Sequence, residues 1–154
     1  MTKVLVDTRE HPSAIKKILR TFERNGVAYE IKKLDVGDYV DPERPNIVVD
    51  RKQNLGELCT NLFSPNDRGR FWREINRAIK GGIKLYILCE CGGKIHTIED
   101  VALWNNKYGR VTGPELREKI YKTHISYGVE FLFCDKRETG KKILEILSEG
   151  AKRE

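Results

Sequence analysis

Two short acidic motifs constrain this chain more than any other feature. They are Gly37-Asp38-Tyr39 and, with its aspartate twelve residues after Asp38, Val48-Val49-Asp50-Arg51-Lys52. Successive side chains of a strand point to opposite faces, so Asp50 and Lys52 share one face. We predict that Asp38 closes one strand and Asp50 ends the next. Both carboxylates should then reach one point, beside the Lys52 ammonium.

This arrangement indicates a particular chemistry. Hard divalent cations bind carboxylate oxygens, so Asp38 and Asp50 are predicted to hold one ion. Such an ion, with an ammonium group beside it, can polarise a phosphodiester, generate hydroxide and offset charge in the transition state. The motifs therefore predict a metal-dependent phosphodiesterase. The alternative for any one of these acids is a surface carboxylate or a helix cap.

The order of the motifs along the chain resembles that of the XPF family of structure-specific DNA endonucleases, a branch of the PD-(D/E)xK nucleases. The matching segments are Val6-Asp7-Thr8-Arg9-Glu10, Val36-Gly37-Asp38-Tyr39, Asp50-Arg51-Lys52 and Gly69-Arg70-Phe71. The resemblance runs from about Val4 to Cys89 and more loosely to the C-terminal helix. It implies a restriction-endonuclease-like, three-layer α/β/α sandwich with a mixed, largely parallel central sheet.

The resemblance and the strand placement together assign roles at the site. Asp38, Asp50 and the backbone carbonyl of Arg51 are expected to hold Mg²⁺ or Mn²⁺. Lys52 would orient the attacking water or stabilise the pentacovalent transition state. Asp7 and Glu10 would add a second metal site or a water-mediated ligand, as a two-metal clamp requires.

A second group of residues is expected to bind DNA phosphates. Arg9, Arg51 and Arg70 carry planar guanidinium groups that suit phosphate oxygens. The segment 67–80, which begins at Asp67, predicts an amphipathic helix with a basic stripe opposite an apolar face. The stripe consists of Arg70, Arg73, Arg77 and Lys80, and the apolar face of Phe71, Trp72, Ile75, Ala78 and Ile79. A basic stripe that is merely solvated is the alternative.

Two positions depart from the family pattern. Asp50 stands where the family usually has glutamate, which is a mild change. Gly56 stands where the family usually has an aspartate, four residues after the lysine. Its neighbour Glu57 would lie about 100° further round a helix and is an uncertain substitute. Slower turnover or an altered metal preference would follow if that aspartate helps to hold the lysine or a second metal.

Three further positions leave alternatives open. Glu90 resembles an acid at the matching strand end of the family, or is only a strand-end charge. Tyr39 either packs under the site or touches DNA, and core packing is favoured. Cys89 and Cys91 with His96 do not predict zinc, because two cysteines one residue apart fall short of the usual Cys-x-x-Cys spacing.

Composition sets the broad class. The chain has 154 residues, of which 39% are hydrophobic and 34% charged, which suits one core. We expect one nuclease domain over 1–150 and a frayed tail over 151–154. The net charge of +6 allows a nucleic-acid partner but does not prove one. No apolar run reaches membrane-spanning length, and four scattered cysteines read as free thiols, so an intracellular location in cytoplasm or nucleoid is expected.

Hydrophobic periodicity predicts alternating strands and helices, which argues for an α/β sandwich. The expected strands are 3–7, 27–34, 46–51, 83–89 and 129–134. The expected helices are 14–25, 54–62, 67–80, 114–127 and 136–148.

The leading functional hypothesis is a Mg²⁺- or Mn²⁺-dependent endonuclease that cuts branched, flapped or forked DNA in repair or recombination, leaving a 3′ hydroxyl and a 5′ phosphate. The alternatives are a DNA-binding scaffold with a weak or inactive site, and an RNA nuclease or restriction-like enzyme. The chain shows no helix-hairpin-helix module and no P-loop. It is therefore expected to be a stand-alone domain of the phage or bacterial type, or an excised fragment. A homodimer or a separate partner would then target it to DNA.

Overall fold

The computed structural model of the protein describes residues 1–65 and 69–152. The strands are β1 (Lys3–Val6), β2 (Ala28–Ile31), β3 (Tyr39–Val40), β4 (Ile47–Lys52), β5 (Lys84–Glu90) and β6 (Glu130–Cys134). The helices are α1 (Lys16–Arg24), α2 (Leu55–Leu62), α3 (Arg70–Lys80), α4 (Gly113–Tyr127) and α5 (Thr139–Lys152). Two short 3₁₀ helices are η1 (Glu99–Leu103) and η2 (Lys136–Glu138).

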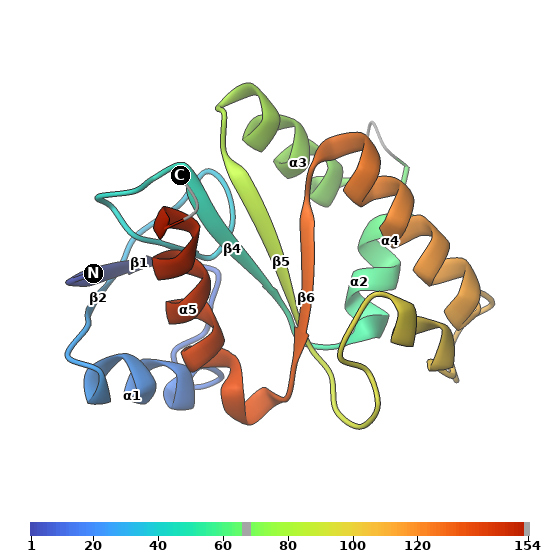
Figure 1. Ribbon diagram of the computed structural model, residues 1–154, viewed down its shortest axis with the longest axis horizontal. Coiled ribbons are helices and arrows are strands. Elements are labelled where there is room, and N and C mark those ends of the chain that lie inside the picture. The colour runs from blue at the N-terminus through green and yellow to red at the C-terminus, as the bar shows by residue number, and fades with distance from the viewer. Residues whose placement is uncertain (66–68, 153–154) are drawn as a thin grey trace.

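The strands form one mixed sheet in the order β2-β1-β3-β4-β5-β6 (Figure 1). β1 pairs in parallel with β2, and β4, β5 and β6 pair in parallel with one another. The two-residue β3 is antiparallel to both of its neighbours, β1 and β4. The predicted α/β architecture with a mixed, largely parallel sheet is confirmed.

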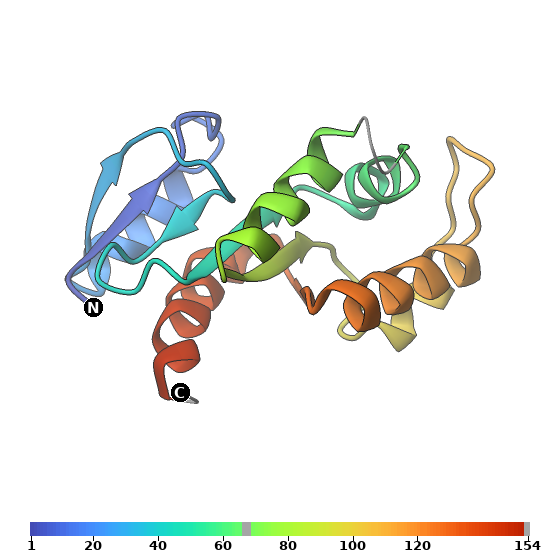
Figure 2. The same cartoon turned by 90° about the horizontal axis from the view of Figure 1, so that it is seen from above.

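Apolar residues on the two faces of the sheet form two separate cores. Val48 of β4 packs in the core that α2, α3 and α4 cover, and the next residue, Val49, packs in the core that α1 and α5 cover. Figure 1 shows these two groups of helices on different sides of the sheet. In Figure 2, α3 lies in the middle of the molecule, between the β1–β3 end and the end formed by α2 and α4. The alternation along β4 therefore decides which layer each of its charged residues will meet.

The order and type of the predicted elements agree with the structure, with a few differences. The prediction that Asp38 closes a strand is wrong: the strand expected over 27–34 ends as β2 at Ile31, and Asp38 immediately precedes β3. A two-residue strand is too short to leave an alternating pattern in the sequence. The 3₁₀ helix η1 was also not expected.

Differences also occur at element ends. The helix expected over 136–148 begins with η2 and continues as α5 to Lys152. Asp67, in the helix expected over 67–80, lies outside the described residues, and α3 begins at Arg70. In the described part of the chain, no helix combines the length and apolarity that crossing a membrane requires.

Candidate active site

Asp38 and Asp50 approach each other because β3 and β4 are antiparallel neighbours. The Asp38 backbone N–H donates to the carbonyl of Val49 over 2.8 Å, and the Arg51 N–H donates to Asp38 Oδ2 over 2.8 Å. Gly37 permits this approach, because its φ is +69° and a Cβ there would lie 2.2 Å from a side-chain carbon of β4. A larger residue at position 37 would push the two acid-bearing segments apart.

Three buried carboxyl groups meet at this point, from Asp38, Asp50 and Glu74 of α3. Burial and the nearby charge of Asp50 raise the pKa of Asp38 well above its ordinary value. The same two causes raise the pKa of Glu74 to about 8. Burial also opposes ionisation of Asp50, but the charge of Lys52 and hydrogen bonds from Asp38 and Glu74 outweigh it and lower its pKa. Asp50 is therefore the ionised member, and its neighbours are drawn toward their protonated forms.

Lys52 lies on the same face as Asp50, as the strand period predicted. Its Nζ is 3.3 Å from Asp50 Oδ2 and 5.1 Å from the centre of the Phe71 ring. Burial alone would lower the pKa of Lys52, but the charges of Asp50, Glu57 and other nearby acids raise it. Lys52 is consequently a fixed cation and hydrogen-bond donor at neutral pH.

Gly56 and Glu57, the positions that depart from the family pattern, face different recesses. Glu57 lines the same cleft as Lys52, and its charge contributes to the raised pKa of Lys52. It also accepts a hydrogen bond from the Gln53 N–H over 2.8 Å. Gly56 lines a separate groove on the other side of α2. Glu57, rather than residue 56, is therefore the acid of α2 that acts on the lysine.

The side chain of Arg51 points away from the cluster, into a buried network. Its Nε and Nη2 donate to Glu10 over 2.6 and 2.9 Å, and its Nη1 donates to Glu90 over 2.5 Å. Tyr39 donates to Glu10 over 2.8 Å, and Thr139, the first residue of α5, donates to Glu90 over 2.5 Å. Burial alone would lower the pKa of Arg51, but its hydrogen bonds and charge contacts with Glu10 raise it.

This network departs from the roles expected for several side chains. The Arg51 side chain is only 4% exposed, so its guanidinium holds protein carboxylates rather than DNA phosphates. Its backbone carbonyl remains a candidate metal ligand. Glu10 lines the cleft, but its carboxylate is already paired with Arg51. Tyr39 is fully buried, as core packing required.

Asp7 is also committed to the fold. Its side chain is fully buried and accepts hydrogen bonds from the Arg9 side chain, from the Arg9 N–H over 3.1 Å and from the Leu34 N–H over 2.7 Å. It does not line the cleft. Burial opposes its ionisation, but these hydrogen bonds prevail and lower its pKa. Asp7 therefore fixes Arg9 and the segment after β2, and the structure does not bring it to the other acids.

The clustered groups line a cleft of about 240 Å³. Asn61 of α2 reaches the same cleft, and its Oδ1 atom is buried without a hydrogen-bond partner among residues 1–65 and 69–152. Buried polar atoms are normally satisfied, so an unpaired one in a cleft indicates a place where a ligand or water would bind.

The donor set of the cleft fits a hard divalent cation. Asp38, Asp50 and Glu74 offer carboxylate oxygens, and Asn61 offers an unpaired amide oxygen. Across the described ranges, no three His, Cys, Asp or Glu side chains already stand in a finished metal-binding geometry. The chemistry of these donors supports a divalent cation at this cleft.

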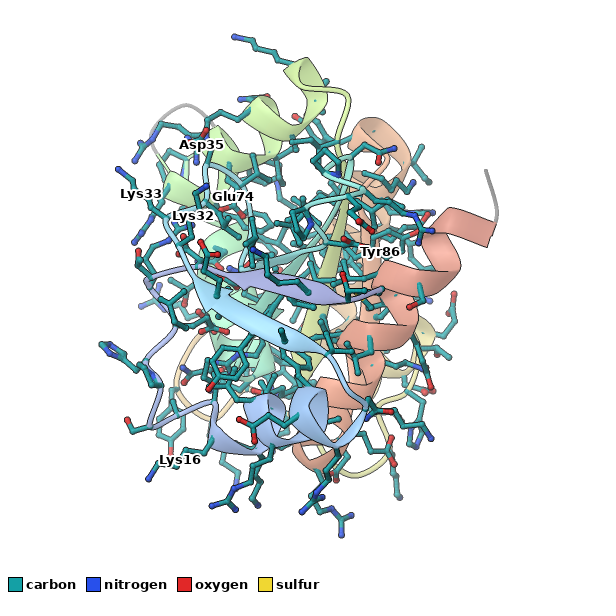
Figure 3. All side chains as sticks on the ribbon, turned by 90° about the vertical axis from the view of Figure 1, so that its left-hand side faces the viewer. Lys16, Lys32, Lys33, Asp35, Glu74 and Tyr86 are labelled. Carbon is teal, nitrogen blue, oxygen red and sulfur yellow. The ribbon has the colours of Figure 1, made fainter. Side chains whose placement is uncertain are left out.

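A basic wall borders the cleft. Arg9 and Arg70 line both the cleft and a neighbouring recess of about 340 Å³ that Lys33 and Arg77 also line. Figure 3, which looks onto this side of the molecule, shows Lys33 at the outer edge on the side where Glu74 lies. The wall therefore presents cations to anything that reaches the carboxylates. Lys33 was missed in the sequence because it fell within the strand expected over 27–34, whereas β2 ends at Ile31 and Lys33 lies in the connection after it.

The basic stripe of α3 is exposed along the helix, at Arg70, Arg73, Arg77 and Lys80. The opposite face is buried as predicted, except that Ile79 is 48% exposed. Glu74 was missed although it had a signal. It sits on the helical wheel between the basic stripe and the apolar face, where an acid next to buried residues suggests a partner.

Other predicted features are located outside the cleft. Cys59, Cys89, Cys91 and Cys134 are free thiols, as expected. Glu90 belongs to the Arg51 network, so its charge is neither isolated nor at the carboxylate cluster.

The sandwich and the acidic, lysine-containing ends of β3 and β4 define a restriction-endonuclease-like α/β fold. A family model described as the ERCC4 domain matches residues 6–147, and the chain belongs to this family.

Two solved structures share the fold. XPF from Aeropyrum pernix is 24% identical with a TM-score of 0.70, and the match covers 98% of this chain and 66% of that one. XPF from Aeropyrum pernix in complex with DNA is 23% identical with a TM-score of 0.70, covering 99% and 66%. The present chain thus spans about two thirds of the length of these proteins. None of the curated proteins matches its sequence.

Proposed function

We propose that this protein is a divalent-metal-dependent endonuclease that cuts DNA where a duplex meets a branch, flap or fork. The observation that carries the proposal is the convergence of Asp38, Asp50 and Lys52 at one cleft in a member of the ERCC4 domain family. The match to an XPF structure in complex with DNA supports DNA as the substrate. Hydrolysis would leave a 3′ hydroxyl and a 5′ phosphate. Residues 1–150 would act as one domain, in DNA repair or recombination inside the cell.

The carboxylates of Asp38 and Asp50 and the carbonyl of Arg51 would hold Mg²⁺ or Mn²⁺, with Glu74 completing the acidic wall. Such an ion supplies charge that polarises the phosphodiester and makes water more acidic. Lys52 would donate to a phosphate oxygen as negative charge grows there, since its ammonium is fixed beside Asp50. Arg9 and Arg70 at the mouth of the cleft would hold neighbouring phosphates.

The Arg51 network would support this chemistry indirectly. It fixes the end of β4, so that Asp50 and Lys52 keep their positions while DNA enters. A homodimer or a separate DNA-targeting partner would add affinity.

The test is a substrate panel. Labelled flap, fork, duplex and single-stranded DNA are incubated with Mg²⁺, Mn²⁺ or EDTA. The native chain is compared with Asp50→Asn and with a matched surface control, Glu23→Gln on α1. We expect metal-dependent cutting near the branch by the native and control proteins, and a loss of about 10³-fold for Asp50→Asn.

A thermal melt with each metal separates binding from catalysis. Mn²⁺ or Mg²⁺ should raise the melting temperature of the native chain and not of Asp50→Asn, because ligands that bind only the folded state stabilise it. DNA binding without cutting under every metal would replace the nuclease with a scaffold function. Cleavage of RNA in preference to DNA would correct the substrate.

A further inference from the structure

A groove of about 790 Å³ lies on the side of α2 opposite the catalytic cleft. One wall is α2 and the residues after it, up to Ser64, and the other is the segment 104–111 between η1 and α4. In Figure 2 this segment, in light orange, projects at the right-hand end of the molecule, near α2. The groove takes no part in the chemistry proposed above.

Aromatic side chains line the groove and are exposed there. Tyr108 is 98% exposed and Phe63 is 43% exposed, and Trp104 also lines the groove. The loop is held in place by its own hydrogen bonds: Asn106 Nδ2 donates to the carbonyl of Val111 over 3.0 Å, and Asn106 Oδ1 accepts from the Tyr108 N–H over 3.2 Å. Tyr108 is thus presented on an ordered turn.

The charge of the groove is positive. Lys107 and Arg110 flank Tyr108, both are exposed, and neither has an ion-pair partner within residues 1–65 and 69–152. Lys119 of α4 adds a cation 5.8 Å from the ring centre of Phe63. None of the described lining residues is Asp or Glu. The occupant should therefore be an anion that also offers flat apolar faces.

A smaller recess lies between the groove and the catalytic cleft. This recess, of about 430 Å³, shares Gln53 with the cleft and shares Asn54, Leu55 and Trp104 with the groove. The cleft, this recess and the groove therefore lie next to one another around the start of α2, and Glu90, Asp135 and Lys136 also line the recess between them. Gly56 lies in the groove wall, where the absence of a side chain keeps the surface open.

We propose that this groove binds an unpaired polynucleotide strand, the single-stranded arm of a branched DNA whose junction lies in the catalytic cleft. Tyr108 and Phe63 would stack on bases, and Lys107, Arg110 and Lys119 would neutralise phosphates. A duplex hides the faces of its bases in its own stack, so exposed aromatic faces favour an unpaired strand. The inference rests on the proposed nuclease function. It adds that the enzyme would recognise the unpaired arm of its substrate, which the catalytic cleft does not contact.

Binding can be measured without cleavage. An oligothymidylate of about 12 nucleotides, within the usual site range for such grooves, is titrated in EDTA while tryptophan fluorescence is followed. The chain has two tryptophans, and Trp72 is 2% exposed, so quenching would report on Trp104 in the groove. Trp104→Phe should remove the signal while anisotropy of a labelled oligonucleotide still reports binding.

Three variants test the proposal. Tyr108→Ala should weaken oligothymidylate binding at least fivefold, and Tyr108→Phe should retain it, because the ring supplies the stacking. Lys107→Gln with Arg110→Gln should reduce the slope of log affinity against log salt by about 1.4, or about 0.7 per lost phosphate contact. The matched control is Lys16→Gln with Arg20→Gln on α1, which should bind like the native chain.

The outcomes separate the groove from the nuclease. Wild-type oligothymidylate affinity in Tyr108→Ala, or no quenching of Trp104 by any oligonucleotide, would overturn the groove proposal, and the second result would point to a peptide partner. An equal loss of blunt-duplex affinity would overturn it too. If the native chain cuts forks and Tyr108→Ala cuts them equally well, only the groove fails. If Tyr108 governs strand binding but no metal supports cutting, only the nuclease proposal fails.

Discussion

The two faces of the end of β4 differ in how their charged side chains are paired. Asp50, Arg51 and Lys52 are consecutive in β4, yet Arg51 faces the α1 and α5 layer while its neighbours face α2 and α3. On the Arg51 side, each charge of the network has an opposite partner within hydrogen-bond distance. On the other face, the carboxyl groups of Asp38, Asp50 and Glu74 lie close enough to shift one another's pKa, and Lys52 is the lysine beside them.

The difference shows how a chain divides charged residues between stability and chemistry. A closed network of paired charges has nothing left to offer a substrate, but it is costly to break. A cluster of carboxyl groups is costly to fold, and a bound cation would relieve that cost. The variants described next alter the two sides of β4 first and then the surfaces around the acidic side.

The largest effect on stability should come from Arg51→Met. The variant leaves Glu10 and Glu90 as buried carboxylates without a cation, so the free energy of unfolding should fall by about 3–5 kcal/mol. Urea unfolding followed by circular dichroism measures the loss. Adding Glu10→Gln and Glu90→Gln to the variant should recover most of it. A loss below about 1 kcal/mol would mean that the network is not structural.

Lys52→Met should show the reverse pattern. Cleavage should fall about 10²- to 10³-fold, because a donor at the developing charge is removed. The free energy of unfolding should fall by less than in Arg51→Met, since Asp50 can take up a proton beside Asp38. Single-turnover cleavage and urea unfolding of the same preparation give both values. Native cleavage rates in this variant would remove Lys52 from the mechanism.

Glu74 should make the metal-free protein less stable at higher pH. Its pKa is about 8 in the folded chain against 4.5 when unperturbed, so the folded state binds the extra proton between these values. The contribution of Glu74 to stability is then greatest below pH 4.5 and is lost as pH rises toward 8, by about 1–2 kcal/mol after allowance for relaxation. Melts in EDTA across this range measure it. Glu74→Gln should flatten the profile, and Glu118→Gln on the surface of α4 should leave it unchanged.

A smaller effect is expected at the basic wall. Arg70→Gln with Lys33→Gln should weaken duplex binding severalfold at low salt and reduce the salt slope by about 1.8, or about 0.9 per phosphate contact. Stability should not change, because both side chains are exposed. Anisotropy at several salt concentrations provides the test. An unchanged salt slope would mean that Arg70 and Lys33 do not contact DNA phosphates.

The smallest effect is expected from Gly56→Ala. A Cβ at this position would meet only Asn54 Oδ1, at 3.1 Å. The free energy of unfolding of this variant should rise by about 0.5 kcal/mol, because alanine has a higher helix propensity than glycine. The variant should cut duplex-containing substrates at the native rate. A severalfold change in cutting rate would show that position 56 acts on the cleft after all.

The local part of the site could be predicted from the sequence, because it depends on the chain within a few residues of each motif. The period of a strand places Asp50 and Lys52 on one face. The same reasoning identified the basic face of α3 from its spacing. These features need no knowledge of how distant segments pack.

The remainder depends on contacts between segments far apart in the sequence. Arg51 was predicted to bind phosphate because the residues next to it in the sequence do not indicate that Glu10 and Glu90 are its partners. Asp7 was predicted to be a metal ligand, but its carboxylate accepts hydrogen bonds from the Leu34 N–H and the Arg9 side chain. Glu74 joins the acids only because α3 packs on the face of the sheet that carries Asp50. Tertiary packing decides which charges are paired, and pairing decides which remain available.

The arginine network also sets an order of events for a growing chain. Asp38, Asp50 and Lys52 come from one short hairpin, whereas the contacts of Arg51 reach from Glu10 through Glu90 to Thr139. The acidic hairpin is therefore synthesised long before the residues that brace it. We expect a nascent chain to hold the Asp38, Asp50 and Lys52 cluster rigidly only when α5 docks and Thr139 reaches Glu90.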